Sequence, residues 1–171
     1  MRGKQIAISS FVFCSLVLLL SSAPVSRADS GDKAKTIKAG AEITLILGSQ
    51  KGKGGLPKEL REWQKQLTAP PFSLFKSFRV VKQIKRPLSN KKDLSLVLVG
   101  PYLMDLGLLE RVAVKGKPIR YRFDLKLFSK KGSKKKKLLH SGRMLLDKGG
   151  TFFVAGPRHE DGTLILGITL K

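Results

Sequence analysis

Acidic residues, cysteine and histidine are all scarce in this chain of 171 residues. It has 12 Asp and Glu against 34 Lys and Arg, which gives a formal net charge of +22 at pH 7. The single cysteine excludes a disulfide framework, a thiolate zinc site and an iron–sulfur cluster. Two histidines leave little from which to build a histidine-based metal site. We therefore expect the protein to hold no metal and no other cofactor.

The apolar run at the N-terminus, Ile6–Leu20, is too short for a membrane span, since crossing a bilayer core takes roughly 20 apolar residues. Arg2 and Lys4 precede the run, and Ala28 ends a pattern of small residues after it. This order is typical of a secretory signal peptide cleaved after Ala28, so we predict that residues 1–28 are a signal peptide. The protein is then exported, to the periplasm or outside the cell. The alternative is an uncleaved segment that anchors a structural subunit to the membrane.

The rest of the chain divides into a flexible polar segment, 29–36, and a single β-rich domain, 37–171. The composition, with 42% hydrophobic residues, is too apolar for a wholly disordered chain. A domain of this length can bury one core without disulfide bonds.

Short strands with turns between them dominate the domain. The clearest pattern is at Ile119–Leu127, where apolar and charged residues alternate, as expected of a half-buried strand with a charged outer face. We predict a mainly β (α+β) fold: one antiparallel β-sandwich or open barrel of about seven strands with one short helix. The apolar run Leu94–Val99 predicts a central strand covered on both faces. Further strands are expected near residues 37–49, 75–86, 111–115, 138–146, 151–156 and 163–170, and Leu103–Leu109 is another apolar stretch.

The one helix is expected to start at Pro57, because proline suits a first helical position. Leu60, Trp63 and Leu67 then form one apolar stripe. This pattern predicts a helix that plugs one end of a sheet, with Trp63 in the core.

A lysine cluster is the most conspicuous candidate site. It occupies the turn of a predicted hairpin, and the exposed side of the strand before it is also basic. We expect a contact with an acidic protein, an anionic lipid headgroup or an acidic polysaccharide. Specific nucleic-acid binding is not expected, because the chain is exported and no aromatic residue interleaves with the lysines. The other interpretation is a solvated loop without a partner. The candidate residues are Arg120, Arg122, Lys126, Lys130, Lys131, Lys134, Lys135, Lys136 and Lys137.

No motif predicts catalysis. His159, Glu160 and Asp161 are adjacent residues in a loop, where Asp161-Gly162 is ordinary turn chemistry, so we expect a structural turn. The sequence thus favours a non-enzymatic exported binding or structural module, a component of the cell envelope. The alternative from a different class is a hydrolase of envelope polymer that uses the loop 159–161.

Two apolar stretches, PPFSLFKSFRVV at Pro70–Val81 and GGTFFVAGPRHEDGTLILGITL at Gly149–Leu170, resemble segments of small exported bacterial proteins with a β-rich core and no assigned function. The resemblance implies an envelope or secreted protein with such a core. It supplies no catalytic residues.

Overall fold

The computed structural model describes residues 36–171, apart from 53 and 132–134. The predicted signal peptide and nearly all of the predicted polar segment, 29–36, lie outside the described residues. In the described part, no helix is long and apolar enough to cross a membrane.

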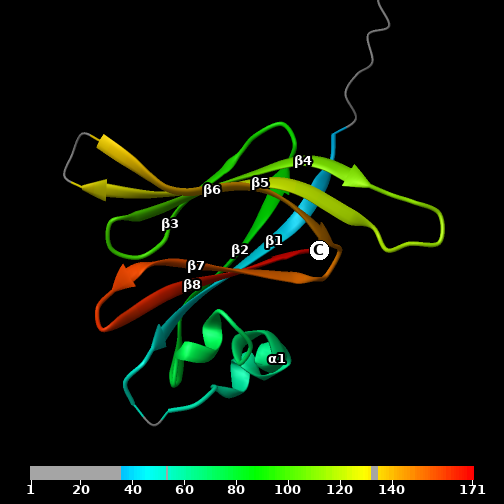
Figure 1. Cartoon of the computed structure of the whole chain (residues 1–171). Helices are drawn as coiled ribbons and strands as arrows, with labels where there is room; N and C mark the ends of the chain where they lie inside the picture. Colours follow the sequence, from blue (N-terminus) through cyan, green and yellow to red (C-terminus); the bar gives the residue numbers. More distant parts are fainter. Residues whose placement is uncertain (1–35, 53, 132–134) are drawn as a thin grey trace, which may run out of the picture. The chain divides into compact units, whose positions relative to one another are not determined.

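Eight antiparallel strands form two sheets of four strands each (Figure 1). Sheet A has the order β2-β1-β8-β7, and sheet B has the order β3-β4-β5-β6. The predicted sandwich is confirmed. The strands are β1 (Lys38–Ser49), β2 (Ser77–Ser89), β3 (Leu94–Val97), β4 (Tyr102–Val112), β5 (Arg120–Lys131), β6 (Lys135–Asp147), β7 (Thr151–His159) and β8 (Gly162–Leu170).

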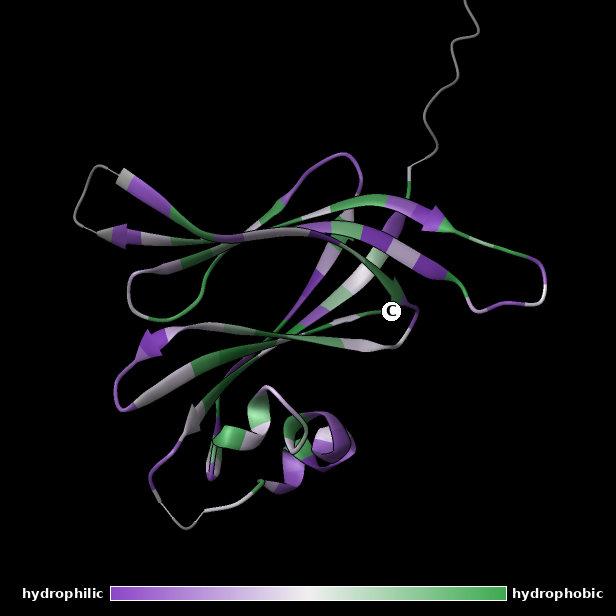
Figure 2. Ribbon diagram, in the orientation of Figure 1, coloured by the Kyte–Doolittle hydropathy of each residue, from purple (hydrophilic) through white to green (hydrophobic). Residues whose placement is uncertain are grey.

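The main core lies between the two sheets, because period-two alternation points every second residue of each strand inward. In β5 the alternation is as predicted: Phe123 and Leu125 are fully buried, whereas Arg122 and Lys126 are exposed. Figure 2 shows apolar residues along the strands of both sheets. The buried side chains of this core include Ile43, Leu45, Leu88, Met104, Leu106, Phe123, Leu125, Leu127, Leu166 and Ile168.

A second apolar cluster covers part of the outer face of sheet A. It joins the helical segment between β1 and β2 to outward residues of the sheet, among them Ile46 and Ile165. Leu60 and Leu67 are fully buried there, and Trp63 packs edge-on against Phe153 with ring centroids 5.5 Å apart. The segment consists of η1 (Lys58–Trp63), α1 (Gln64–Leu67) and η2 (Phe72–Leu74).

Two local expectations were wrong. The segment from Pro57 is mostly 3₁₀ helix, with only one α-helical turn, and it lies on a face of sheet A within the second cluster instead of plugging a sheet end. Leu94–Val97 is a short edge strand that pairs only with β4, and Val97 is 64% exposed. Leu94 and Leu96 of this strand pack against the main core, whereas Val97 on its other face is exposed to solvent.

The strand β2 forms one edge of sheet A, and its sequence hinders pairing with a strand of another chain. Lys82, Lys85, Arg86 and Pro87 are exposed along it. Charged residues and proline on an edge strand hinder pairing with another chain.

Candidate functional site

Lysines gather at the adjoining ends of β5 and β6, residues 129–131 and 135–137, which we call the basic hairpin. The strand register places Lys130 directly opposite Lys136. Like charges directly opposite each other in an antiparallel pair destabilise the sheet. In the part of the chain that the structure describes, neither lysine forms an ion pair with a carboxylate. Of the remaining candidate lysines, Lys134 lies outside the described residues.

The strand face that leads to the basic hairpin is different, because its arginines are neutralised. Arg120 Nε lies 2.7 Å from Asp147 Oδ1, and Arg122 Nη1 lies 2.7 Å from Glu110 Oε2. A third pair joins Arg143 to Asp124, through two hydrogen bonds of 2.9 and 3.3 Å. We call these three pairs the ion-pair ladder.

The ion-pair ladder runs across β4, β5 and β6, and it accounts for two of the predicted binding residues, Arg120 and Arg122. The hydrogen bonds from Arg143 lower the pKa of Asp124 below its ordinary value. Exposed pairs of this kind stabilise a fold by only about 0–1 kcal/mol each. Sequence reasoning missed the ladder because its acids come from three different strands.

An apolar row separates the ion-pair ladder from the basic hairpin on the outer face of sheet B. It consists of Val97, Leu103, Phe128 and Leu138, one residue from each strand, in continuous register. Val97 is 64% exposed and Leu138 is 51% exposed. With strands about 4.8 Å apart, the row is about 14 Å long.

Lysine borders the apolar row closely. The ammonium of Lys136 lies 5.6 Å from the centroid of the Phe128 ring. Such a contact is favourable because the ring face carries negative charge. On the ladder side, Lys126 lies opposite Asp105 in the register. In the described part of the chain Lys126 forms no ion pair with a carboxylate, and the same holds for Lys130, Lys136 and Lys137 on the hairpin side, so most of the unpaired lysines near the row lie on that side.

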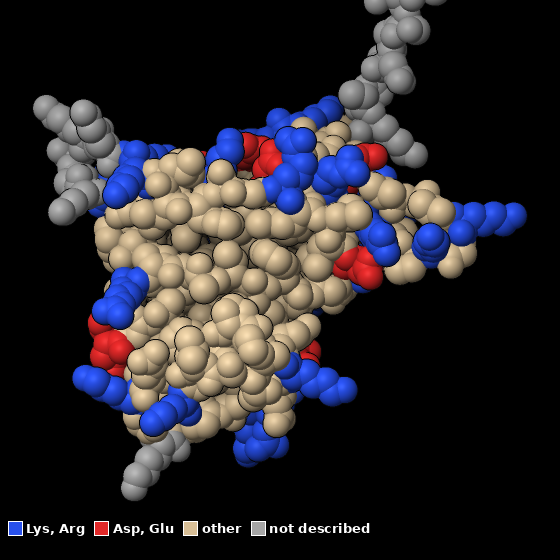
Figure 3. Space-filling view, viewed as in Figure 1, with Lys and Arg blue, Asp and Glu red and all other residues tan. Residues whose placement is uncertain are grey.

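Other cations lie far from the basic hairpin. Arg111, Lys115 and Lys117 are near the β4–β5 connection, which is at the opposite end of β5 (Figure 1). At about 3.3 Å per residue, β5 separates the two ends by about 36 Å. On the face seen in Figure 3, Lys and Arg side chains lie along the margins, around a centre without charged side chains. The positive charge of this protein is thus divided among several places.

The turn at His159–Asp161 joins β7 to β8 and is held by structural contacts. Glu160 adopts a φ of 51° and its Oε2 lies 2.9 Å from Arg79 Nη2. His159 packs edge-on against the ring of Tyr102, whose hydroxyl donates a hydrogen bond of 2.8 Å to the Arg158 carbonyl oxygen. Arg79 thus binds one carboxylate oxygen of Glu160, and the other, Oε1, lies 3.7 Å from His159 Nε2.

The described residues contain no group of three or more His, Cys, Asp or Glu side chains that could hold a metal ion.

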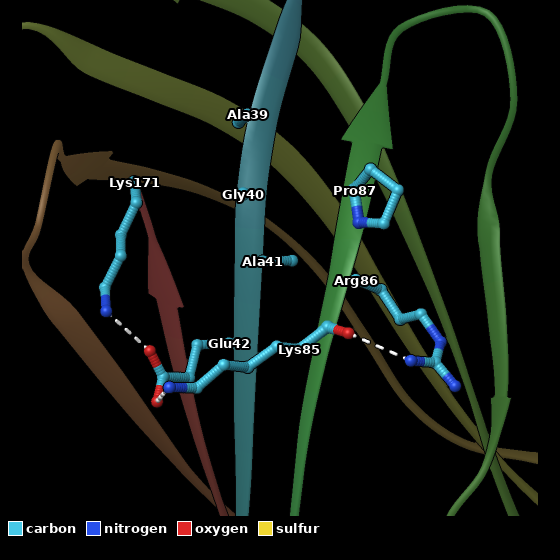
Figure 4. A pocket seen from close by; sticks show the side chains of 8 residues that line it. All are labelled: Ala39, Gly40, Ala41, Glu42, Lys85, Arg86, Pro87 and Lys171. Carbon is cyan, nitrogen blue, oxygen red and sulfur yellow. Dashed lines mark hydrogen bonds and ion pairs between the residues drawn. The ribbon is translucent and has the colours of Figure 1, made fainter.

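A shallow hollow of about 470 Å³ lies where β1 meets β2 and the C-terminus (Figure 4). Three of its charged groups are paired, since Glu42 lies 2.6 Å from Lys171 Nζ and 3.2 Å from Lys85 Nζ. The fourth, Arg86, donates a hydrogen bond of 3.0 Å to the Lys85 carbonyl oxygen. The hydrogen bond from Lys171 is the main cause that lowers the pKa of Glu42. Ala39, Gly40 and other small residues leave the hollow open. We assign it a structural role, in which Glu42 links the last residue to two strands.

No protein family, no curated protein and no solved structure matches this chain.

Proposed function

We propose that the protein is a non-enzymatic, exported binding module of the cell envelope that contacts a polyanionic surface through the basic hairpin. The observation that carries the proposal is the placement of Lys130 opposite Lys136 without a carboxylate partner among the described residues. Because this arrangement lowers the stability of the fold, the two lysines are better explained by binding to an external partner than by a structural role.

The electrostatics support a contact with anions of many kinds. Exposed ammonium groups of one sign at a strand end raise the local concentration of anions, and the effect falls as salt screens it. Lysine is a point charge without the fork geometry of arginine, so it selects for charge more than for shape. The ion-pair ladder reduces the part that Arg120 and Arg122 play in this attraction.

The proposal is tested by removing three charges from the basic hairpin, with Lys130, Lys136 and Lys137 each changed to Gln. Binding to heparin and to vesicles that contain phosphatidylglycerol is measured across a salt titration. At about 1 kcal/mol per lysine near an anionic surface, we expect affinity for the vesicles to fall about 100-fold at low salt.

The matched control removes three charges from the opposite end of sheet B, with Arg111, Lys115 and Lys117 each changed to Gln. We expect this control to bind nearly as well as the parent protein. Equal losses in the two triple variants would mean that net charge alone matters, and salt-insensitive binding would also contradict the proposal.

A further inference from the structure

We propose that the polyanionic surface is an anionic lipid bilayer, and that the apolar row enters its headgroup region while the basic hairpin contacts lipid phosphates. This inference rests on the proposed function and adds the chemical class of the partner. It also gives a role to Val97, Leu103, Phe128 and Leu138, which the electrostatic argument leaves unexplained.

The apolar row interrupts a pattern of charged residues on the outer face of sheet B. Elsewhere on β5 the outward positions carry charge, as Arg120, Arg122, Asp124 and Lys126 show. At Phe128 the pattern changes, and the aligned residues on all four strands are apolar. Leu139, which is 40% exposed, lies beside the row because the β5–β6 register shifts between Leu127 and Phe128. An exposed apolar patch rimmed by polar residues marks a contact surface.

Lysine charge lies beside the apolar row. Lys130 and Lys136 face outward two register positions beyond Phe128, where their ammonium groups can meet phosphates while the row lies deeper. Lysine suits this geometry, because its apolar stem can lie along buried surface while its charge stays in water. Amphipathic helices that lie in the membrane interface likewise combine apolar side chains on one face with lysine and arginine on the other.

The other possible occupants fit the surface less well. A soluble polysaccharide offers charge but nothing that would bury Val97 and Leu138. A second copy of this chain would bring two basic hairpins together, and their lysines would repel. Protein interfaces are depleted of lysine and enriched in arginine, whereas the arginines on this face are held in the ion-pair ladder.

Tryptophan reporters distinguish insertion from purely electrostatic contact. We would compare two variants, Leu138→Trp and Leu145→Trp. Leu145 lies on the same strand and the same outer face, within the ion-pair ladder. The two positions are similarly exposed, since Leu145 is 46% exposed and Leu138 is 51% exposed. Trp63 is the chain's only tryptophan, and the spectrum of the parent protein corrects for it. The vesicles contain phosphatidylcholine, with or without a minority of phosphatidylglycerol.

With phosphatidylglycerol present, we expect emission from Trp at position 138 to shift to shorter wavelength and to be quenched by lipids brominated in the acyl chain. Emission from position 145 should not change. In a second variant, Val97→Ser with Leu138→Ser, vesicle affinity should fall about tenfold, because two apolar side chains no longer transfer from water. Heparin affinity should stay that of the parent.

Each contrary result is informative. Unchanged emission at position 138, together with heparin and vesicle binding that depend only on the lysines, would overturn lipid insertion and leave the proposed function standing. A parent protein that binds neither vesicles nor heparin would overturn both. A concentration-dependent dimer that the Val97→Ser, Leu138→Ser variant abolishes would show that a second copy covers the row, and would overturn the lipid assignment.

Discussion

At the level of single residues, Glu42 forms two ion pairs that connect β1 to β2 and to the C-terminus. It is only 20% exposed and lies between two ammonium groups, which belong to Lys85 and Lys171. The second of these follows β8, and its backbone pairs with Gly40 through hydrogen bonds of 2.9 and 2.8 Å. The side chains and the backbone therefore fasten the C-terminus to the same part of β1.

We expect Glu42→Gln to destabilise the protein by about 1 kcal/mol at neutral pH, since a charge-assisted hydrogen bond is weakened. The pKa of Glu42 is lowered by folding, so its contribution is present above its unfolded value, near 4.5, and is lost as pH falls through the lowered folded pKa. Urea unfolding between pH 7 and pH 3 measures this. A difference between parent and variant that does not shrink below pH 4.5 would show that the charge is not its source.

At the element scale, the helical segment is attached to sheet A by close packing around glycines. A Cβ atom on Gly48 of β1 would lie 2.8 Å from Cγ of Phe75 and 3.0 Å from Cδ1 of Ile165. On β8, a Cβ on Gly167 would lie 2.8 Å from the ring of Phe153. The small residues on the outer face of the sheet thus make room for the aromatic rings of the second cluster.

Gly48→Ala should therefore destabilise the protein by about 1–3 kcal/mol through overpacking. The control is Gly40→Ala on the same strand, where the nearest atom to the new Cβ, Cβ of Lys171, is at an ordinary distance of 3.7 Å. Urea denaturation of the two variants gives the comparison. Equal free energies of unfolding for the two variants would mean that the side chains around Gly48 accommodate the new methyl group without loss of stability.

At the scale of the whole molecule, the two sheets differ in what their outer faces meet. Sheet A packs the main core on one face and the helical segment on part of the other. Sheet B packs the main core on its inner face, and its outer face carries the ion-pair ladder and the apolar row. The outer face of sheet B is therefore the broad surface on which we place the contact.

The net charge of +22 also acts on the molecule as a whole, because cations repel one another more in the compact state than in the unfolded one. We expect the melting temperature to rise as NaCl increases from about 0.02 M to about 0.3 M, since screening reduces this repulsion. The rise should be smaller when Lys130, Lys136 and Lys137 are changed to Gln. Calorimetry measures both, and a melting temperature that falls with salt would mean that the surface ion pairs outweigh the repulsion.

Features that depend only on neighbouring residues could be predicted from the amino-acid sequence. Alternation at Ile119–Leu127 was enough to predict a half-buried strand, and the lysine cluster was enough to predict a charged hairpin end. A period of two is a local property, and so is a run of like charges. The sandwich followed from the number of such strands.

Which strands are neighbours, and in what register they pair, became clear from the folded chain. The acids that neutralise Arg120 and Arg122 are distant in sequence, and so are the residues of the apolar row. The edge position of Leu94–Val97 also depends on which strands lie beside it. Register is fixed by turns, by bulges and by packing of the whole core, so the composition of a single strand does not reveal it.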